Sequence, residues 1–131
     1  CVAMLPVPLG RDEKLIGAAG NFLILLLLTD VLSVQSGLRK DRGVKALNGF
    51  LPPNLRRLAE DATFLPALNH EELARFQLRL ARIMQAHGPA ICKQWGVDYP
   101  QALEDAALGY VAGELRLMGF AATLEELHRL P

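Results

Sequence analysis

Phe22-Leu-Ile-Leu-Leu-Leu-Leu28 is a run of seven consecutive large apolar residues, and it sets the main constraint on how this chain folds. On an α-helix such a run leaves no face for water, so the helix must be surrounded by protein or by lipid. Lipid is the less favourable environment, because Asn21 and Asp30 interrupt the segment and a central aspartate costs about 2.5–3.5 kcal/mol on insertion scales. The run therefore predicts a helix at the centre of a helical bundle or packed against another domain.

Composition predicts one compact domain over residues 1–131 and a surface that something else covers. The chain has 131 residues, enough to close a single core without disulfides or metals. Its apolar fraction of 51% and its mean hydropathy of +0.20 are high for a soluble chain, which favours a covering partner, a second copy or a missing domain. The 14 basic and 14 acidic residues cancel, so nucleic acid and an anionic membrane are not expected partners.

Cysteine usage favours a reducing compartment. Cys1 and Cys92 cannot form a disulfide framework and have no paired metal-ligand spacing, so we expect a cytoplasmic protein. A chain that begins with Cys1 and shows no signal-peptide pattern is expected to be a fragment of a longer protein or a processed product.

The N-terminal half predicts an extended entry segment followed by two helical regions. Residues 1–10 contain two prolines, which favours an extended segment. The acidic pair in Arg11-Asp-Glu-Lys14 is typical of a helix start, and this helix is predicted to run to about Arg39. Residues 44–62 form a second helical region, which the Pro52-Pro53 pair divides, so that a helix begins near Pro53.

The C-terminal half predicts two or three more helices. Asn69 is a typical N-cap, and the helix after it is expected to break or kink at Gly88-Pro89. Tyr99-Pro100 starts another helix that runs to Gly119, and Thr123 caps a last short one. The prediction is an all-α fold: an antiparallel four- to five-helix bundle with a short extended N-terminal segment.

Asp30 is the first candidate binding residue, because a carboxylate within an apolar helix must find a partner or reach the surface. One interpretation is a structural salt bridge to Arg39, Lys40 or Arg56. The other is a polar group that lines a substrate cleft next to a catalytic domain.

A basic cluster follows the first predicted helix and adds the other candidate substrate-binding residues: Arg39, Lys40, Arg42 and Lys45. Arginine and lysine clusters bind phosphate groups, so this turn is a candidate nucleotide contact. The alternative is an ordinary solvated loop.

Two short patterns offer alternative chemistry. Arg82-Ile-Met-Gln-Ala-His87 has an arginine, four residues and a histidine, a spacing similar to the ribonuclease motif of HEPN bundles; this resemblance implies Arg82 and His87 as catalytic residues. Otherwise His87 interacts with a helix C-terminus. Glu125-Glu-Leu-His128 has the spacing of di-iron bundles, but no second such motif accompanies it, so we expect no metal site in this chain.

One family resemblance covers the first half of the chain. Leu5-Pro-Val-Pro-Leu9 before a long apolar helix, Gly37-Leu-Arg-Lys-Asp-Arg-Gly43, Ala46-Leu-Asn-Gly-Phe-Leu-Pro52 and Asn54-Leu-Arg-Arg57 resemble the helical domain that follows the catalytic domain in polymerase-beta-type nucleotidyltransferases. The chain lacks that family's catalytic Gly-Ser motif. The resemblance therefore implies a non-catalytic accessory domain that helps to bind nucleotide or acceptor substrate, within a magnesium-dependent parent enzyme.

Three functions follow from these patterns. The leading one is the accessory domain of a nucleotidyltransferase, whose partner is an upstream catalytic domain. The second is a HEPN-like ribonuclease of the toxin–antitoxin type, which would act as a symmetric dimer. The third is a helical interaction or oligomerisation module, which predicts an apolar patch on the surface and no polar cleft.

Overall fold

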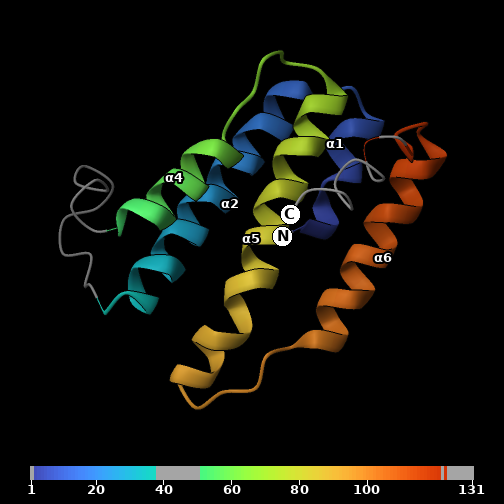
Figure 1. Cartoon of the computed structure of the whole chain (residues 1–131). Coiled ribbons are helices and arrows are strands. Elements are labelled where there is room, and N and C mark those ends of the chain that lie inside the picture. Colours follow the sequence, from blue (N-terminus) through green and yellow to red (C-terminus); the bar gives the residue numbers. More distant parts are fainter. Residues whose placement is uncertain (1, 38–50, 122, 124–131) are drawn as a thin grey trace.

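The computed structural model describes residues 2–37, 51–121 and 123, and the regular secondary structure in this part of the chain is all helical (Figure 1). The predicted all-α bundle is confirmed. In chain order the elements are the short 3-10 helix η1 (Val2–Met4) and the α-helices α1 (Pro6–Gly10), α2 (Lys14–Gln35), α4 (Pro53–Ala62), α5 (His70–Gln94) and α6 (Gln101–Leu117).

The four longer helices alternate in direction, as an up-and-down bundle requires (Figure 1). The central pair, α2 and α5, is therefore parallel, and it makes the most extensive helix contact. Asn21 of α2 lies beside Leu73 near the start of α5, and Val34 lines the same hollow as Trp95, which follows α5. The shorter α4 packs on one side of this pair, and α6 runs along the other side of α5 (Figure 1).

The N-terminal segment differs from the prediction, because it is helical rather than extended. Pro6 and Pro8 lie in the first turn of α1, where backbone N–H groups have no helical partner and a proline removes nothing. Leu5 and Leu9, one turn apart, are buried against Leu73 and Leu115. The prolines thus start a helix that the core holds in place.

Helix boundaries follow local chemistry in most places. The N-cap prediction at Asn69 is confirmed, since its side chain accepts a hydrogen bond from the Glu72 N–H at 2.9 Å. The helix start near Pro53 is also confirmed. By contrast α2 ends at Gln35 rather than near Arg39, because Gly37 adopts a left-handed conformation (φ +70°) that terminates helices. The expected helical stretch before residue 51 lies largely outside the described residues.

The predicted break at Gly88-Pro89 does not occur, because α5 continues to Gln94. A proline ring clashes with the Cβ of the residue before it, and Gly88 has no Cβ. The glycine therefore lets the helix pass through Pro89 with the loss of a backbone hydrogen bond.

Two apolar clusters form the core, and α5 contributes to both. The first joins α5 to the N-terminal helices and α6, and consists of Leu5, Leu9, Leu73, Ala74, Leu78, Val111 and Leu115. The second joins α5 to α2 and α4, and consists of Leu28, Leu32, Leu51, Leu55, Ala62, Phe76, Leu80 and Ile83. Because it takes part in both clusters, α5 is the central helix of the fold.

The position of α2 differs from one of the two predicted alternatives, a helix enclosed at the centre of the bundle, while packing against another domain stays a prediction. The Phe22–Leu28 run is not enclosed by the bundle: Leu28 is buried, but Phe22, Leu23, Leu26 and Leu27 are exposed. The buried side of α2 includes the polar residues Asn21, Thr29 and Ser33. Four of the seven side chains of the apolar run are therefore exposed outside the bundle.

A pair of truncations on α2 tests this orientation. Leu32→Ala removes a fully buried side chain and should lower the free energy of unfolding by about 2–5 kcal/mol. Leu15→Ala removes a side chain that is 74% exposed and should change it by less than about 1 kcal/mol. Urea unfolding followed by circular dichroism, at low protein concentration, measures both. Equal losses would contradict the orientation of α2.

Candidate functional site: the outer face of α2

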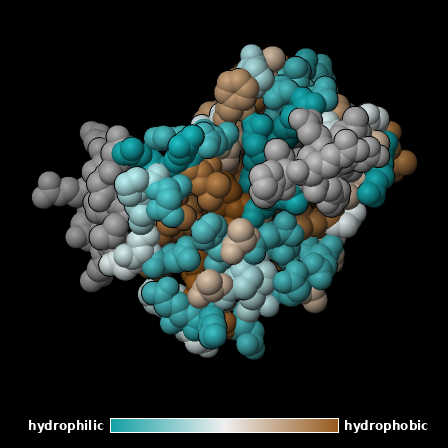
Figure 2. Space-filling view, in the orientation of Figure 1, coloured by the Kyte–Doolittle hydropathy of each residue, from teal (hydrophilic) through white to brown (hydrophobic). Residues whose placement is uncertain are grey.

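The exposed side of α2 carries large apolar side chains along almost its whole length. Their exposed fractions run from 38% to 74%. We call this surface the α2 outer face; it consists of Leu15, Ile16, Phe22, Leu23, Leu26, Leu27 and Val34. Ala19, Gly20 and Asp30 are exposed between them. Figure 2 shows one side of the molecule, on which brown apolar side chains come to the surface beside the teal polar ones.

The size of the α2 outer face is unusual for a free surface. Taking roughly 180 Å² for a fully exposed large apolar side chain, the exposed fractions amount to about 600 Å². The largest apolar patch on a typical monomer is about 300–600 Å², and patches at that limit often serve in binding. This face therefore has the extent of an interaction surface.

Hydrogen bonds on the inner side of α2 fix this orientation. The Asn21 side-chain amide donates to the Leu73 carbonyl of α5 at 2.9 Å and is fully buried. The hydroxyls of Thr29 and Ser33 donate to carbonyls within α2, those of Leu26 (2.8 Å) and Thr29 (2.7 Å). These bonds engage both hydroxyls and the Asn21 amide nitrogen, although the buried Asn21 Oδ1 has no hydrogen-bond partner among the described residues.

Close contact near the start of α2 restrains its rotation further. A Cβ added at Gly17 would lie 3.3 Å from a side-chain methyl of Leu73, so this leucine packs directly on the α2 backbone there. At the edge of the outer face, the Phe22 ring packs edge-on against Phe76, with ring centres 5.4 Å apart. Any rotation that brought the outer leucines inward would break these contacts.

An apolar groove borders the outer face, along the joint between α2 and α5. One hollow of about 200 Å³ is lined by Ile24, Leu27, Leu28, Val31, Leu80, Ala81 and Met84. A second, of about 370 Å³, is lined by Asp30, Val31, Val34, Ile91 and Trp95. Both hollows include Val31, so they adjoin each other along this joint, and the second reaches Trp95, a side chain that is 63% exposed.

A separate hollow of about 390 Å³ lies between α5 and α6, and a polar latch closes one end of it. The Tyr99 hydroxyl donates to the Glu104 carboxylate, which also accepts from Gln85 at 3.4 Å and Gln101 at 3.3 Å. Burial raises the pKa of Tyr99 above its ordinary value, and the hydrogen bond and charge of Glu104 raise it further. The carboxylate is committed to three donors, so this arrangement holds α6 to α5 rather than activating a nucleophile.

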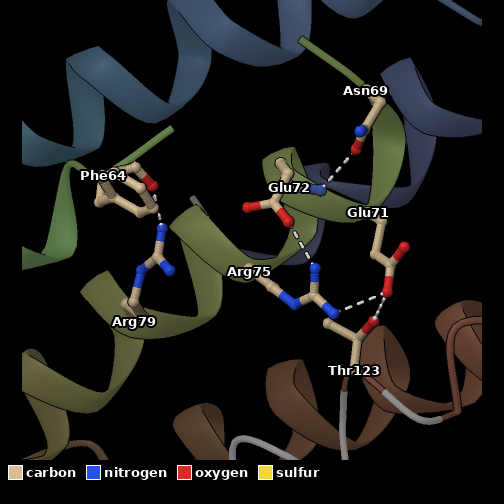
Figure 3. A network of polar contacts seen from close by, with 7 residues as sticks. All are labelled: Phe64, Asn69, Glu71, Glu72, Arg75, Arg79 and Thr123. Atoms are coloured by element: carbon tan, nitrogen blue, oxygen red, sulfur yellow. Dashed lines mark hydrogen bonds and ion pairs between the residues drawn. The ribbon is translucent and has the colours of Figure 1, made fainter. Parts of the chain in front are cut away.

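The strongest polar network lies at the start of α5 and is also structural (Figure 3). Arg75 forms ion pairs with Glu71, at 2.7 Å, and with Glu72. Thr123 donates to Glu71 at 3.3 Å. These pairs join the first turn of α5 to residue 123 near the C-terminal end.

Arg79, one turn further along α5, bonds the carbonyls at the end of α4. Its Nε donates to the Ala62 carbonyl at 3.2 Å, and a terminal nitrogen donates to the Phe64 carbonyl (Figure 3). A helix leaves its last carbonyls without partners, so Arg79 caps α4. This arginine is therefore engaged in holding the fold.

Of the five predicted substrate-binding residues, the structure describes one, Asp30. Asp30 is exposed on α2, at the rim of the hollow that reaches Trp95. Its side chain therefore reaches the surface, and both interpretations of this residue, the structural salt bridge and the substrate cleft, stay predictions. Arg39, Lys40, Arg42 and Lys45 lie outside the described residues.

The alternative catalytic pair does not converge. Arg82 and His87 are both half-buried on the continuous helix α5. Five residues on an α-helix separate two side chains by about 140° around the axis, so the two leave different faces. Among the described residues, no group of three or more histidine, cysteine or acidic side chains is placed to hold a metal ion.

By length and composition alone, α2 could also cross a membrane. The buried helices of soluble proteins and signal sequences pass the same test, so this finding is weak evidence. The packing adds a further consideration: α5 runs beside α2 and carries Arg75 and Arg79 at the same level. A bilayer around α2 would place these arginines in hydrocarbon, which is costly.

A glycine substitution tests the latch between α5 and α6. A Cβ at Gly88 would lie 2.4 Å from the Tyr99 ring, so Gly88→Ala should displace the ring, weaken its bond to Glu104 and lower the pKa of Tyr99. Absorbance titration at alkaline pH measures this in a Tyr110→Phe background, where Tyr99 is the remaining tyrosine.

The matched control is Gly109→Ala on α6, where an added Cβ meets nothing within 4 Å. It should leave the Tyr99 titration unchanged and stabilise the fold by about 0.5–1 kcal/mol, as alanine does in a helix. Identical titrations for the two variants would mean that Gly88 does not position Tyr99.

Comparison with known protein families, with curated proteins and with solved structures finds no match to this chain.

Proposed function

We propose that this domain is a helical protein–protein interaction module that docks through the α2 outer face. The observation that carries the proposal is the distribution of residues on α2. Its inner side holds the polar residues Asn21, Thr29 and Ser33. Leu28 and Leu32 are buried beside them, but seven other large apolar residues of α2 are exposed. A helix that served only the core of this bundle would bury its large apolar residues and expose its polar ones.

The energetics of the face favour docking on another apolar surface. Removing about 600 Å² of apolar area from water is worth on the order of 15 kcal/mol. Association itself costs roughly 4–15 kcal/mol in lost freedom. A partner that contributes apolar surface of its own therefore makes the free energy of association favourable, whereas a polar partner does not.

Charge supports a protein rather than a nucleic acid as the partner. The chain has no net charge, and Asp30 is the charged residue within the outer face. Nucleic-acid binding depends on clustered basic side chains that contact phosphates. An apolar face with a single charged residue instead resembles the buried centre of a protein interface, where charged residues are depleted.

The nucleotidyltransferase hypothesis stays a prediction. Its basic cluster, Arg39 to Lys45, lies outside the described residues. The phosphate contact and the magnesium-dependent parent enzyme that this hypothesis includes therefore also stay predictions. An upstream catalytic domain is nonetheless one protein that could cover the α2 outer face. The cytoplasmic location, expected from the cysteine content, also stays a prediction.

Photo-crosslinking tests whether this face docks on protein. A photoreactive amino acid at Leu23, the centre of the outer face, should yield protein adducts when the chain is expressed in cells, because a partner covers that position. The same residue at Leu117 on α6, which is 83% exposed, is the control and should yield far fewer.

The yield of protein adducts, resolved by gel and identified by mass spectrometry, decides the outcome. Equal yields at Leu23 and Leu117 would show no preference for the outer face and would contradict the proposal. Adducts at Leu23 with lipid alone would also contradict it.

A further inference from the structure

We propose that the partner is a second copy of this chain, and that two α2 outer faces pack antiparallel about a two-fold axis near Leu23. This inference rests on the proposed docking function and specifies its partner. Three properties of the face carry it: its surface relief, its area and the position of its one carboxylate.

The relief of the face is self-complementary. Ala19 and Gly20 are exposed, and a Cβ added at Gly20 would meet nothing within 4 Å, so this part of the face is a shallow depression. Leu26 and Leu27 project from the next turns. The depression precedes Leu23 by three to four residues, and the projection follows it by the same interval.

A two-fold axis at Leu23 brings these two features together. In an antiparallel pair, a residue before the axis on one helix meets a residue equally far beyond it on the other. Leu26 and Leu27 of each copy then lie over Ala19 and Gly20 of the other, which is the packing of large side chains against small ones that close helix pairs use. An isologous contact of this kind closes as a dimer.

The area is sufficient for a stable dimer. Each face offers about 600 Å², so two faces bury about 1,200 Å², the lower limit of specific protein interfaces. Side chains that line the adjoining groove, such as Val31 and Trp95, extend the contact beyond that limit.

The charge on the face selects the antiparallel arrangement. Asp30 follows Leu23 by seven residues, and Ile16, in the first turn of α2, precedes it by seven. The antiparallel pair therefore places each Asp30 beside the start of the opposite α2. That helix start already follows two acidic residues, Asp12 and Glu13, so the gain from this arrangement is separation: the two Asp30 carboxylates lie about 21 Å apart along the axes.

A parallel pair would have the opposite electrostatic effect. It would place the two Asp30 carboxylates at the same level on an apolar interface. Like charges facing each other across such an interface oppose association. The structure thus favours one arrangement of the two copies over the other.

Sedimentation of the purified chain over a concentration series tests for the dimer. The mass should be twice that of one chain, and Leu23→Glu should halve it by placing a charge on the axis. Leu117→Glu, on the exposed side of α6, is the matched control and should leave the dimer intact. Thermal unfolding of each variant shows that it is folded.

Cysteine cross-linking tests the arrangement, in a Cys1→Ser and Cys92→Ser background. With a short thiol cross-linker, Leu23→Cys should yield covalent dimers. Ile16→Cys alone should not, because the two copies of position 16 lie about 21 Å apart along the axes. A mixture of Ile16→Cys and Asp30→Cys chains should cross-link again.

The possible outcomes separate this inference from the function on which it rests. Homotypic cross-linking at both 16 and 23 would show a parallel pair and overturn the arrangement. A chain that stays monomeric at all concentrations would overturn the second copy as partner, while protein adducts at Leu23 in cells would still support docking. A monomer that floats with phosphatidylcholine vesicles and gives no such adducts would overturn both.

Discussion

The hydrogen bond from the buried Asn21 side chain to the Leu73 carbonyl is the constraint on which the rest of the architecture depends. It joins the two longest helices near their starts and fixes which side of α2 faces α5. A buried amide that lost this acceptor would cost about 1–3 kcal/mol, so rotation of α2 is resisted. With the rotation fixed, Leu28 enters the core while Leu23, Leu26 and Leu27 stay exposed, and α5 is the central helix of the bundle.

That arrangement explains how a chain with so much exposed apolar surface still has a complete core. The two clusters meet on α5, whose inner residues Leu73, Phe76 and Leu80 are almost fully buried. On its other flank, α5 is held by the Thr123–Glu71 bond and the Tyr99–Glu104 latch. The α2 outer face is therefore not needed to close the core. Its side chains are free to serve an interface.

Much of the helical layout could be predicted from local chemistry. The Asn69 cap and the Pro53 start were correct because each depends on one residue and its nearest backbone. The extended form of residues 1–10 and the break at Pro89 were wrong predictions. In the first case the core buries Leu5 and Leu9, and in the second Gly88 removes one steric clash of the proline.

The hydrophobic pattern could not predict which side of α2 faces the bundle, because a helix that is apolar all round has no side that is distinctly more apolar than the others. The signal lay instead in Asn21, Thr29 and Ser33, whose spacing places polar groups toward the bundle. The basic cluster at Arg39 to Lys45 lies outside the described residues, so its phosphate contact stays a prediction.

An apolar face with a single carboxylate also limits how its partner is found. Without a charged field to steer encounters, association proceeds at the slower rate set by random orientation. Affinity then depends on shape and area, and on how often the right surface is met. A second copy is met often wherever the chain is made, because its concentration is that of the chain itself. A domain tethered in the same chain is also met often, because the tether gives it a high effective concentration. The face therefore suits partners that are already close, and among these the relief around Leu23 matches its own copy.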